Sequence, residues 1–214
     1  MPRVAFRLWL RPDPAGIETY VRHHLDPFDG LYDMIRAAGI RRYTIWLDGA
    51  DLLLTREGDD PLKGETLDMD DPVHLEWSNT MRPLFDERVA REGAAHPTEV
   101  FALDPAADPG PAQMTYRSGL RPGSDAMDAL VKAHRAMPPD VVGALRAAGI
   151  RRQWTWVEDG DAWTYLECDD LDATEAALST AAPYRAWSDP MADLLDDRTR
   201  RDGRRRTREV FRCD

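Results

Sequence analysis

The 214-residue sequence has few cysteines, no long apolar run and an excess of negative charge. Cys168 and Cys213 are its only cysteines, and they have neither the spacing of a metal site nor the number needed for a disulfide framework. No apolar segment is long enough to span a bilayer. Near the N-terminus, Arg7 and Arg11 interrupt the stretch that a signal peptide would keep apolar. We therefore expect a cytoplasmic protein without a membrane span.

The net charge also limits the classes of binding partner that we expect. A formal net charge of −11 argues against general binding to nucleic acid or to anionic membranes, because both repel an acidic protein. One basic run, "RTRRDGRRRTR" from Arg198 to Arg208, is an exception to the acidic character of the chain. In so acidic a chain, we interpret it as a surface loop that neutralises neighbouring carboxylates rather than as a nucleic-acid arm.

One heptapeptide occurs twice. "RAAGIRR" spans Arg36 to Arg42 and returns at Arg146 to Arg152, and the same offset aligns the rest of the chain without a gap. Roughly 31 of about 102 aligned pairs are identical, including the pair His24 and His134. This self-similarity predicts two units, residues 1–104 and 113–214, joined by a Pro- and Gly-containing linker at residues 105–112.

Within each copy, the hydrophobic periodicity changes in a fixed order. Alternation in "VAFRLWLR" indicates a strand, and the segment from Ile17 to Ala38 has helical periodicity, interrupted near Pro27 and closed by Gly39. "RRYTIWL" and "LLLTRE" are two further strands, Asp71 followed by Pro72 starts a second helix, and "TEVFAL" is the last strand.

The order β-α-β-β-α-β is that of a ferredoxin-like unit. Each copy would form one four-stranded sheet with helices on one face, and the other face would need cover. We therefore predict an α+β fold in which the two units form an intramolecular pseudo-dimeric α+β barrel. Such a chain would exist as a monomer with an internal pseudo-dimer or as a homodimer.

Four side chains of the first copy form a candidate site. Tyr20 and His24 are four residues apart on a helix and so share a face, Tyr43 opens the next strand, and Trp77 lies on the second helix. Histidine exchanges protons near neutral pH, phenols donate hydrogen bonds, and an indole packs against the C–H face of a sugar. The common alternative is that such residues are core, and the residues alone leave that open. The other histidines lack partners at ligand spacing, so we expect no metal site among them.

These residues lie in segments that resemble the L-rhamnose mutarotase family. The resemblance rests on "FRLWLRPDPAGIETYVRHH", "AAGIRRYTIWLDG", "DPVHLEWSNTMRPLF" and "EVF", and it covers the first copy more closely than the second. It implies an isomerase that interconverts the anomers of a monosaccharide such as L-rhamnose, without metal or cofactor, from a dimeric α+β barrel. It also implies that His24 is the general acid and that Tyr20, Tyr43 and Trp77 contact the sugar.

Two rival functions remain. Cofactor-free monooxygenases and polyketide cyclases use barrels of the same architecture, and a non-catalytic module that binds a small ligand is also compatible with the sequence.

The second copy has diverged at the candidate site. Leu130 and Gln153 replace Tyr20 and Tyr43, whereas His134 and Trp187 are retained as a possible second site. We expect this second pocket to be more apolar, and the first copy to keep the activity.

Two further pairs of equivalent residues carry predictions of their own. We assign Trp46 and its counterpart Trp156 to the helix-facing core. Arg7 and Arg117 occupy equivalent strand positions, where they are either solvated at an edge or available to a ligand.

Overall fold

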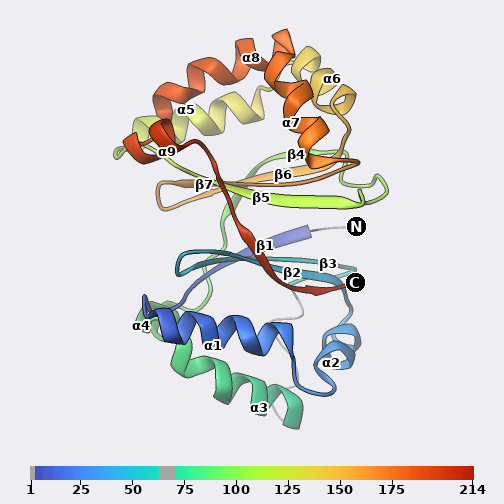
Figure 1. The fold of residues 1–214 in the computed structure, drawn as a ribbon, viewed down its shortest axis with the longest axis vertical. Coiled ribbons are helices and arrows are strands. Elements are labelled where there is room, and N and C mark those ends of the chain that lie inside the picture. The colour runs from blue at the N-terminus through green and yellow to red at the C-terminus, as the bar shows by residue number, and fades with distance from the viewer. Residues whose placement is uncertain (1–2, 63–70) are drawn as a thin grey trace. The chain divides into compact units, whose positions relative to one another are not determined.

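A computed structural model describes residues 3–62 and 71–214 of the chain and divides it into two compact units. The first unit contains residues 1–96 together with residues 208–214, and the second contains residues 97–207. Each unit has one antiparallel sheet with helices packed on one of its faces (Figure 1). The α+β fold class with one sheet in each half is therefore confirmed.

The first unit has a four-stranded sheet in the order β1-β3-β2-β9. Its elements are β1 (Arg3–Trp9), α1 (Pro14–Leu25), α2 (Leu31–Ala37), β2 (Ile40–Asp48), β3 (Asp51–Gly58), α3 (Pro72–Met81), the 3-10 helix η2 (Arg82–Leu84), α4 (Glu87–Glu92) and β9 (Arg208–Cys213).

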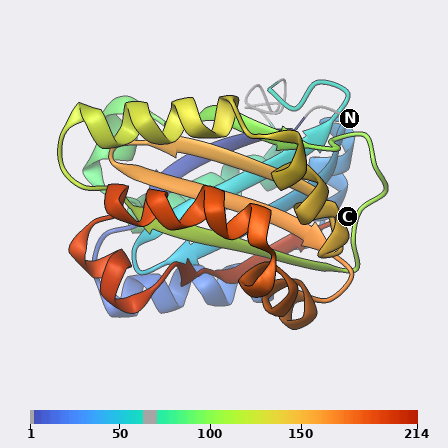
Figure 2. The same cartoon turned by 90° about the horizontal axis from the view of Figure 1, so that it is seen from above.

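The second unit has a five-stranded sheet in the order β4-β6-β7-β5-β8, and its helices cover one face of that sheet (Figure 2). Its elements are β4 (Thr98–Leu103), β5 (Ala112–Gly119), α5 (Ser124–Arg135), α6 (Pro139–Ala147), β6 (Ile150–Glu158), β7 (Asp161–Cys168), α7 (Leu171–Thr180), α8 (Ala182–Ser188), the 3-10 helix η3 (Asp189–Leu194), α9 (Asp197–Asp202) and β8 (Arg205–Arg206).

The helices of the first unit begin where capping residues occur in the sequence. Asp71 caps α3, because its carboxylate accepts a hydrogen bond of 2.8 Å from the backbone N–H of Val73. Asp13 caps α1 in the same way, and α1 therefore begins at Pro14 rather than at Ile17. The predicted interruption near Pro27 is present, since α1 ends at Leu25 and α2 starts at Leu31.

The last strand of each repeat pairs in the sheet of the other repeat. β9, at the end of the second copy, pairs antiparallel with β2 of the first copy, and β4, at the end of the first copy, pairs with β6 of the second. The expectation that each copy completes its own sheet was wrong on this point. Because β2 and β6 each pair with β3 or β7 on one side only, an exchanged strand covers the backbone edge that would otherwise be open.

The duplicated heptapeptide connects a helix to the strand that pairs with the exchanged one: it joins α2 to β2 in the first copy and α6 to β6 in the second. Gly39 and Gly149 end α2 and α6 at φ values of 78° and 89°, a left-handed conformation that favours glycine. The first arginine of each heptapeptide contacts the end of the other repeat: Arg36 donates to the backbone carbonyl of Asp214, at 3.2 Å. Arg146 binds the carboxylate of Asp104 at 2.6 Å.

The sheet alternation corrects the placement of two tryptophans. Ile45 and Leu47 of β2 pack in the cluster formed with α1 and α2, so Trp46 between them points to the opposite face of the sheet. Trp156 likewise points away from the helices, because its neighbour Val157 in β6 packs in the cluster that includes residues of α5. Both indoles are buried, but the prediction that they belong to the helix-facing core was wrong.

The equivalent arginines Arg7 and Arg117 lie on that same opposite face and are largely buried. Arg7 forms an ion pair of 2.8 Å with Asp51, and Arg117 forms one of 2.7 Å with Asp161. The reading of these arginines as solvated edge residues was therefore wrong, and each has a carboxylate partner that neutralises it.

No helix in residues 3–62 and 71–214 has the length and apolar character required to cross a membrane.

The exchanged strands predict where equivalent substitutions will act. Val210 of β9 is buried in the first unit and Val100 of β4 in the second, at matching positions of the two repeats. Replacing either valine with alanine should lower the free energy of unfolding by about 1–3 kcal/mol, because it leaves a cavity in a packed cluster. In hydrogen exchange, Val210→Ala should raise the rates of β2 and α1, and Val100→Ala those of β6 and α5. The opposite assignment would contradict the exchange of strands.

Candidate functional site

A cavity of about 620 Å³ lies between the sheet and the helices of the first unit. Strand residues form its floor, including Leu8, Tyr43, Ile45 and Leu54, and the helices α1, α2 and α3 form its walls. All four residues of the sequence-based candidate site line this one cavity: Tyr20, His24, Tyr43 and Trp77. A volume of this size is within the usual range for small-molecule sites.

His24 is held rigidly in the wall of this cavity. Its side chain is buried, at 4% exposure, and its ring lies 4.1 Å from the ring of Tyr20 and 4.7 Å from that of Trp77. Its Nδ1 lies 2.8 Å from the backbone carbonyl oxygen of Tyr20. Because a carbonyl only accepts, Nδ1 carries the proton in the neutral ring and Nε2 carries the lone pair.

Burial sets the protonation states of His24 and Tyr20. Loss of solvent lowers the pKa of His24 to about 4, despite the hydrogen bond to Tyr20 that acts in the other direction. Burial, together with the neighbouring Tyr43, raises the pKa of the Tyr20 phenol well above its usual value. At neutral pH the site therefore presents a neutral imidazole that can accept a proton beside a phenol that can donate one.

Two residues of this cavity were missed from the sequence. Arg56 follows Leu52 and Leu54 on the helix-facing side of β3, and its guanidinium lies 5.1 Å from the ring centre of Tyr43 and 4.6 Å from that of Phe6. The alternation of the sequence could have indicated Arg56, because this residue places a charge on the otherwise apolar face of the strand. Phe211, 5.5 Å from the ring of His24, comes from β9 of the other repeat, and no local pattern indicates that.

The second unit has its own cavity, of about 710 Å³, at the equivalent place. His134 and Trp187 line it, with ring centres 5.1 Å apart, and Nδ1 of His134 lies 3.0 Å from the carbonyl oxygen of Leu130. Burial lowers the pKa of His134, and the charge of Arg204 adds to this effect although the contact with Leu130 opposes it. The histidine arrangement of the first unit is thus repeated.

The lining of the second cavity differs from the expectation. Ser118, Thr155 and Thr164 form its floor where Leu8, Ile45 and Leu54 stand in the first copy. Tyr116 and Tyr184 supply two phenols that replace the two that were lost with Leu130 and Gln153. The prediction of a more apolar second pocket was therefore wrong, because the substitutions on neighbouring strands were not considered together.

The basic run also contributes to the second cavity. Its first part, up to Asp202, lies in α9, and Arg205 and Arg206 form β8. The side chains of Arg200, Arg204 and Arg206 line the cavity but remain exposed, and Arg200 and Arg206 pair with carboxylates, as expected of a surface that neutralises itself. Arg206 forms an ion pair with Glu175, which also accepts a hydrogen bond from Tyr116.

Within the described ranges, no group of three or more His, Cys, Asp or Glu side chains has the arrangement of a metal site.

A family model described as L-rhamnose mutarotase matches the chain twice, over residues 3–103 and residues 114–213. The chain belongs to the L-rhamnose mutarotase family. The two matches correspond to the two repeats and indicate a tandem duplication, and the family that gives the model its name is one of isomerases. A search of curated proteins gave no match.

Solved structures share the fold at low sequence identity. A candidate monooxygenase from Lactobacillus acidophilus NCFM superposes with a TM-score of 0.54 at 9% identity, covering 99% of this chain and 94% of the other. An anthrone oxidase-like protein gives a TM-score of 0.50 at 11% identity, covering 97% of this chain and 93% of the other. At these identities the similarity concerns the fold alone.

The low pKa of His24 predicts a specific dependence of stability on pH. Between its ordinary value of 6.5 and about 4, the unfolded chain binds a proton at this position that the folded chain does not. This contribution to the free energy of unfolding is therefore most favourable above pH 6.5 and is lost as the pH falls to about 4. The difference corresponds to about 2–4 kcal/mol.

We expect His24→Leu to flatten the stability–pH curve over this window, measured by denaturant unfolding at a series of pH values. The matched control is His23→Leu, which changes the neighbouring, half-exposed histidine. If His23→Leu flattened the curve and His24→Leu did not, the burial of a neutral His24 would be disproved.

Proposed function

We propose that the first cavity interconverts the anomers of a monosaccharide, L-rhamnose or a related sugar, with His24 as the proton-transfer residue. The observation that carries the proposal is the fixed tautomer of His24, whose Nδ1 is bound to the carbonyl of Tyr20 at 2.8 Å. Because this contact occupies Nδ1, Nε2 is the ring nitrogen that can accept a proton from the ligand. Family membership supports the reaction class, since a mutarotase needs one positioned proton acceptor and one donor.

The chemistry follows from these protonation states. In ring opening, Nε2 of His24 takes the proton of the anomeric hydroxyl, a carbonyl forms at the anomeric carbon, and its bond to the ring oxygen breaks. The Tyr20 phenol is kept protonated by its raised pKa, and its ring lies 4.1 Å from that of His24, so it can donate a proton to the ring oxygen. Rotation of the open aldehyde and reversal of these transfers give the other anomer. In this scheme His24 acts first as a base, whereas family resemblance alone had suggested an acid.

The remaining residues of the cavity would position the sugar. Trp77 presents its indole to the ring of His24 and can pack against the C–H face of a pyranose. The Tyr43 hydroxyl and the Arg56 guanidinium lie on the floor and can hydrogen-bond sugar hydroxyls.

A second candidate function is supported by the apolar floor. Leu8, Ile45 and Leu54 are unusual neighbours for a sugar and suit a flat aromatic ligand instead, as in cofactor-free oxygenation or in cyclisation of a polyketide. A non-catalytic binding role would use the same surface. Tryptophan fluorescence against sugars and polycyclic phenols separates these functions, because sugars should quench it under the first proposal and aromatics under the second.

The first proposal predicts the kinetics of anomer exchange. Using NMR exchange on L-rhamnose and related neutral sugars, we expect the wild type to accelerate the exchange and His24→Gln to lose about 10²–10⁴-fold of the rate. His134→Gln is the matched control, because it changes the equivalent histidine of the other repeat, and it should leave the rate unchanged. Exchange lost only in His134→Gln would move the reaction to the second unit. Absence of acceleration for every sugar tested would overturn the proposal.

A further inference from the structure

The second cavity has polar groups at positions where the first copy has apolar ones. Ser118, Thr155 and Thr164 share the helix-facing side of the sheet, and the hydroxyls of Thr155 and Thr164 lie 3.4 Å apart. In a purely structural copy, these floor positions would be filled by apolar residues, because a buried hydroxyl loses free energy when water is not replaced. A floor of hydroxyls below a cavity of about 710 Å³ indicates a ligand that carries hydroxyl groups of its own.

Arg204 gives this cavity a positive charge. The cationic side chains that line it are Arg200, Arg204 and Arg206, and the anionic ones are Glu175 and Asp189. Arg206 pairs with Glu175 and lies 3.6 Å from Asp172, and Arg200 lies 3.8 Å from Asp193. Over the residues that the structure describes, Arg204 alone of these three arginines forms no ion pair or hydrogen bond.

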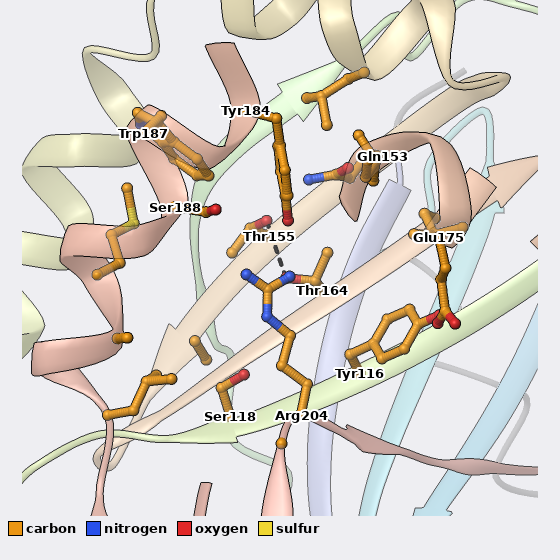
Figure 3. A pocket seen from close by; sticks show the side chains of 18 of the residues that line it. Tyr116, Ser118, Gln153, Thr155, Thr164, Glu175, Tyr184, Trp187, Ser188 and Arg204 are labelled. Atoms are coloured by element: carbon orange, nitrogen blue, oxygen red, sulfur yellow. Dashed lines mark hydrogen bonds between the residues drawn. The ribbon is translucent and has the colours of Figure 1, made fainter. Parts of the chain in front are cut away.

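The side chain of Arg204 is exposed to solvent and reaches over the opening of the hydroxyl-lined floor. Figure 3 shows its guanidinium beside Thr155 and Thr164, with Ser118 and Ser188 on either side and Tyr184 across the cavity. It also lies close enough to His134 for its charge to act on that imidazole. The aligned residue of the first copy is Ala94, so this cation is specific to the second cavity.

We propose that the second cavity binds a hydroxylated carboxylic acid of monosaccharide size, that is, a sugar acid. The carboxylate pairs with the planar guanidinium of Arg204, and the hydroxyls contact the serine and threonine floor. Trp187 and His134 form the wall against which the carbon skeleton packs. One unpaired guanidinium neutralises one negative charge, which favours a carboxylate over a phosphate dianion.

Binding here is independent of the reaction proposed at His24. The two cavities are built from different strands and helices, and they differ in their floors and in where their arginines lie: Arg56 is on β3 in the first unit, whereas Arg204 follows α9 in the second. The duplicated chain would thus hold two sites with different linings on one polypeptide.

The experiment is calorimetric titration of the full chain with D-glucuronate, D-galacturonate and D-gluconate, and with D-glucose and D-glucose 6-phosphate for comparison. We expect at least one sugar acid to bind and D-glucose to bind more weakly. Arg204→Gln should weaken that binding about 10- to 100-fold, since it removes a charge-assisted pair. Arg201→Gln makes the same charge change on an exposed arginine that does not line the cavity and should have no effect.

Two further variants distinguish a loss of ligand binding from a loss of folding. Thr155→Ile and Thr164→Leu introduce the residues that the first copy has at these positions, so the sheet should tolerate them while the hydroxyl floor is lost. We expect both to abolish the binding of the sugar acid and to leave circular dichroism unchanged.

Failure of all three acids to bind would overturn the proposal, as would equal binding by Arg204→Gln. Tighter binding of D-glucose 6-phosphate than of any acid would assign the site to phosphate and reject the carboxylate. Anomer exchange on neutral sugars by Arg204→Gln reports separately on His24, so the failure of one proposal is distinguishable from the failure of the other.

Discussion

The open edges of β2 and β6 are the constraint on which the rest of the structure depends. A strand with unpaired N–H and C=O groups along one side is a template for pairing with another strand, including a wrong one. In this chain each edge is covered by the final strand of the other repeat. The arginines that begin the duplicated heptapeptide hold the residues just after those strands, Asp214 and Asp104. The most strongly retained segment of the sequence thus serves the junction between a helix and the strand that pairs with the borrowed one.

This pairing connects the fold to the chemistry of the first cavity. β9 is required to complete the sheet, and it also carries Phe211 to within 5.5 Å of the ring of His24. The aromatic residues around His24 remove solvent from it and lower its pKa to about 4. The strand β9, which backbone hydrogen bonding requires, therefore also helps to keep His24, the residue proposed to move protons, in its neutral form. His134 has an equivalent neighbour in Phe101 of β4, with ring centres 6.3 Å apart.

Much of the fold could be predicted because the relevant signals are local. Alternation located the strands, Asp71 and Gly39 marked helix ends, and the recurrence of one segment exposed the duplication. The exchange of strands could not be predicted, since the sequences of β4 and β9 are compatible with either partner. For the site, helical spacing correctly brought Tyr20 and His24 into one cavity. The second cavity was misjudged from Leu130 and Gln153 alone, because residues distant in sequence determine its polarity.

The exchange of final strands has a consequence for how this chain can change over generations. Each repeat contributes a strand to the sheet of the other, so removal of one repeat also changes the sheet of the repeat that remains. The shared framework therefore holds two cavities whose lining residues can differ. Floor positions such as Thr155 and Thr164 differ from Ile45 and Leu54 of the first copy, although the equivalent strands pair in the same order. Interlocked duplicates of this kind can hold two specificities within one chain.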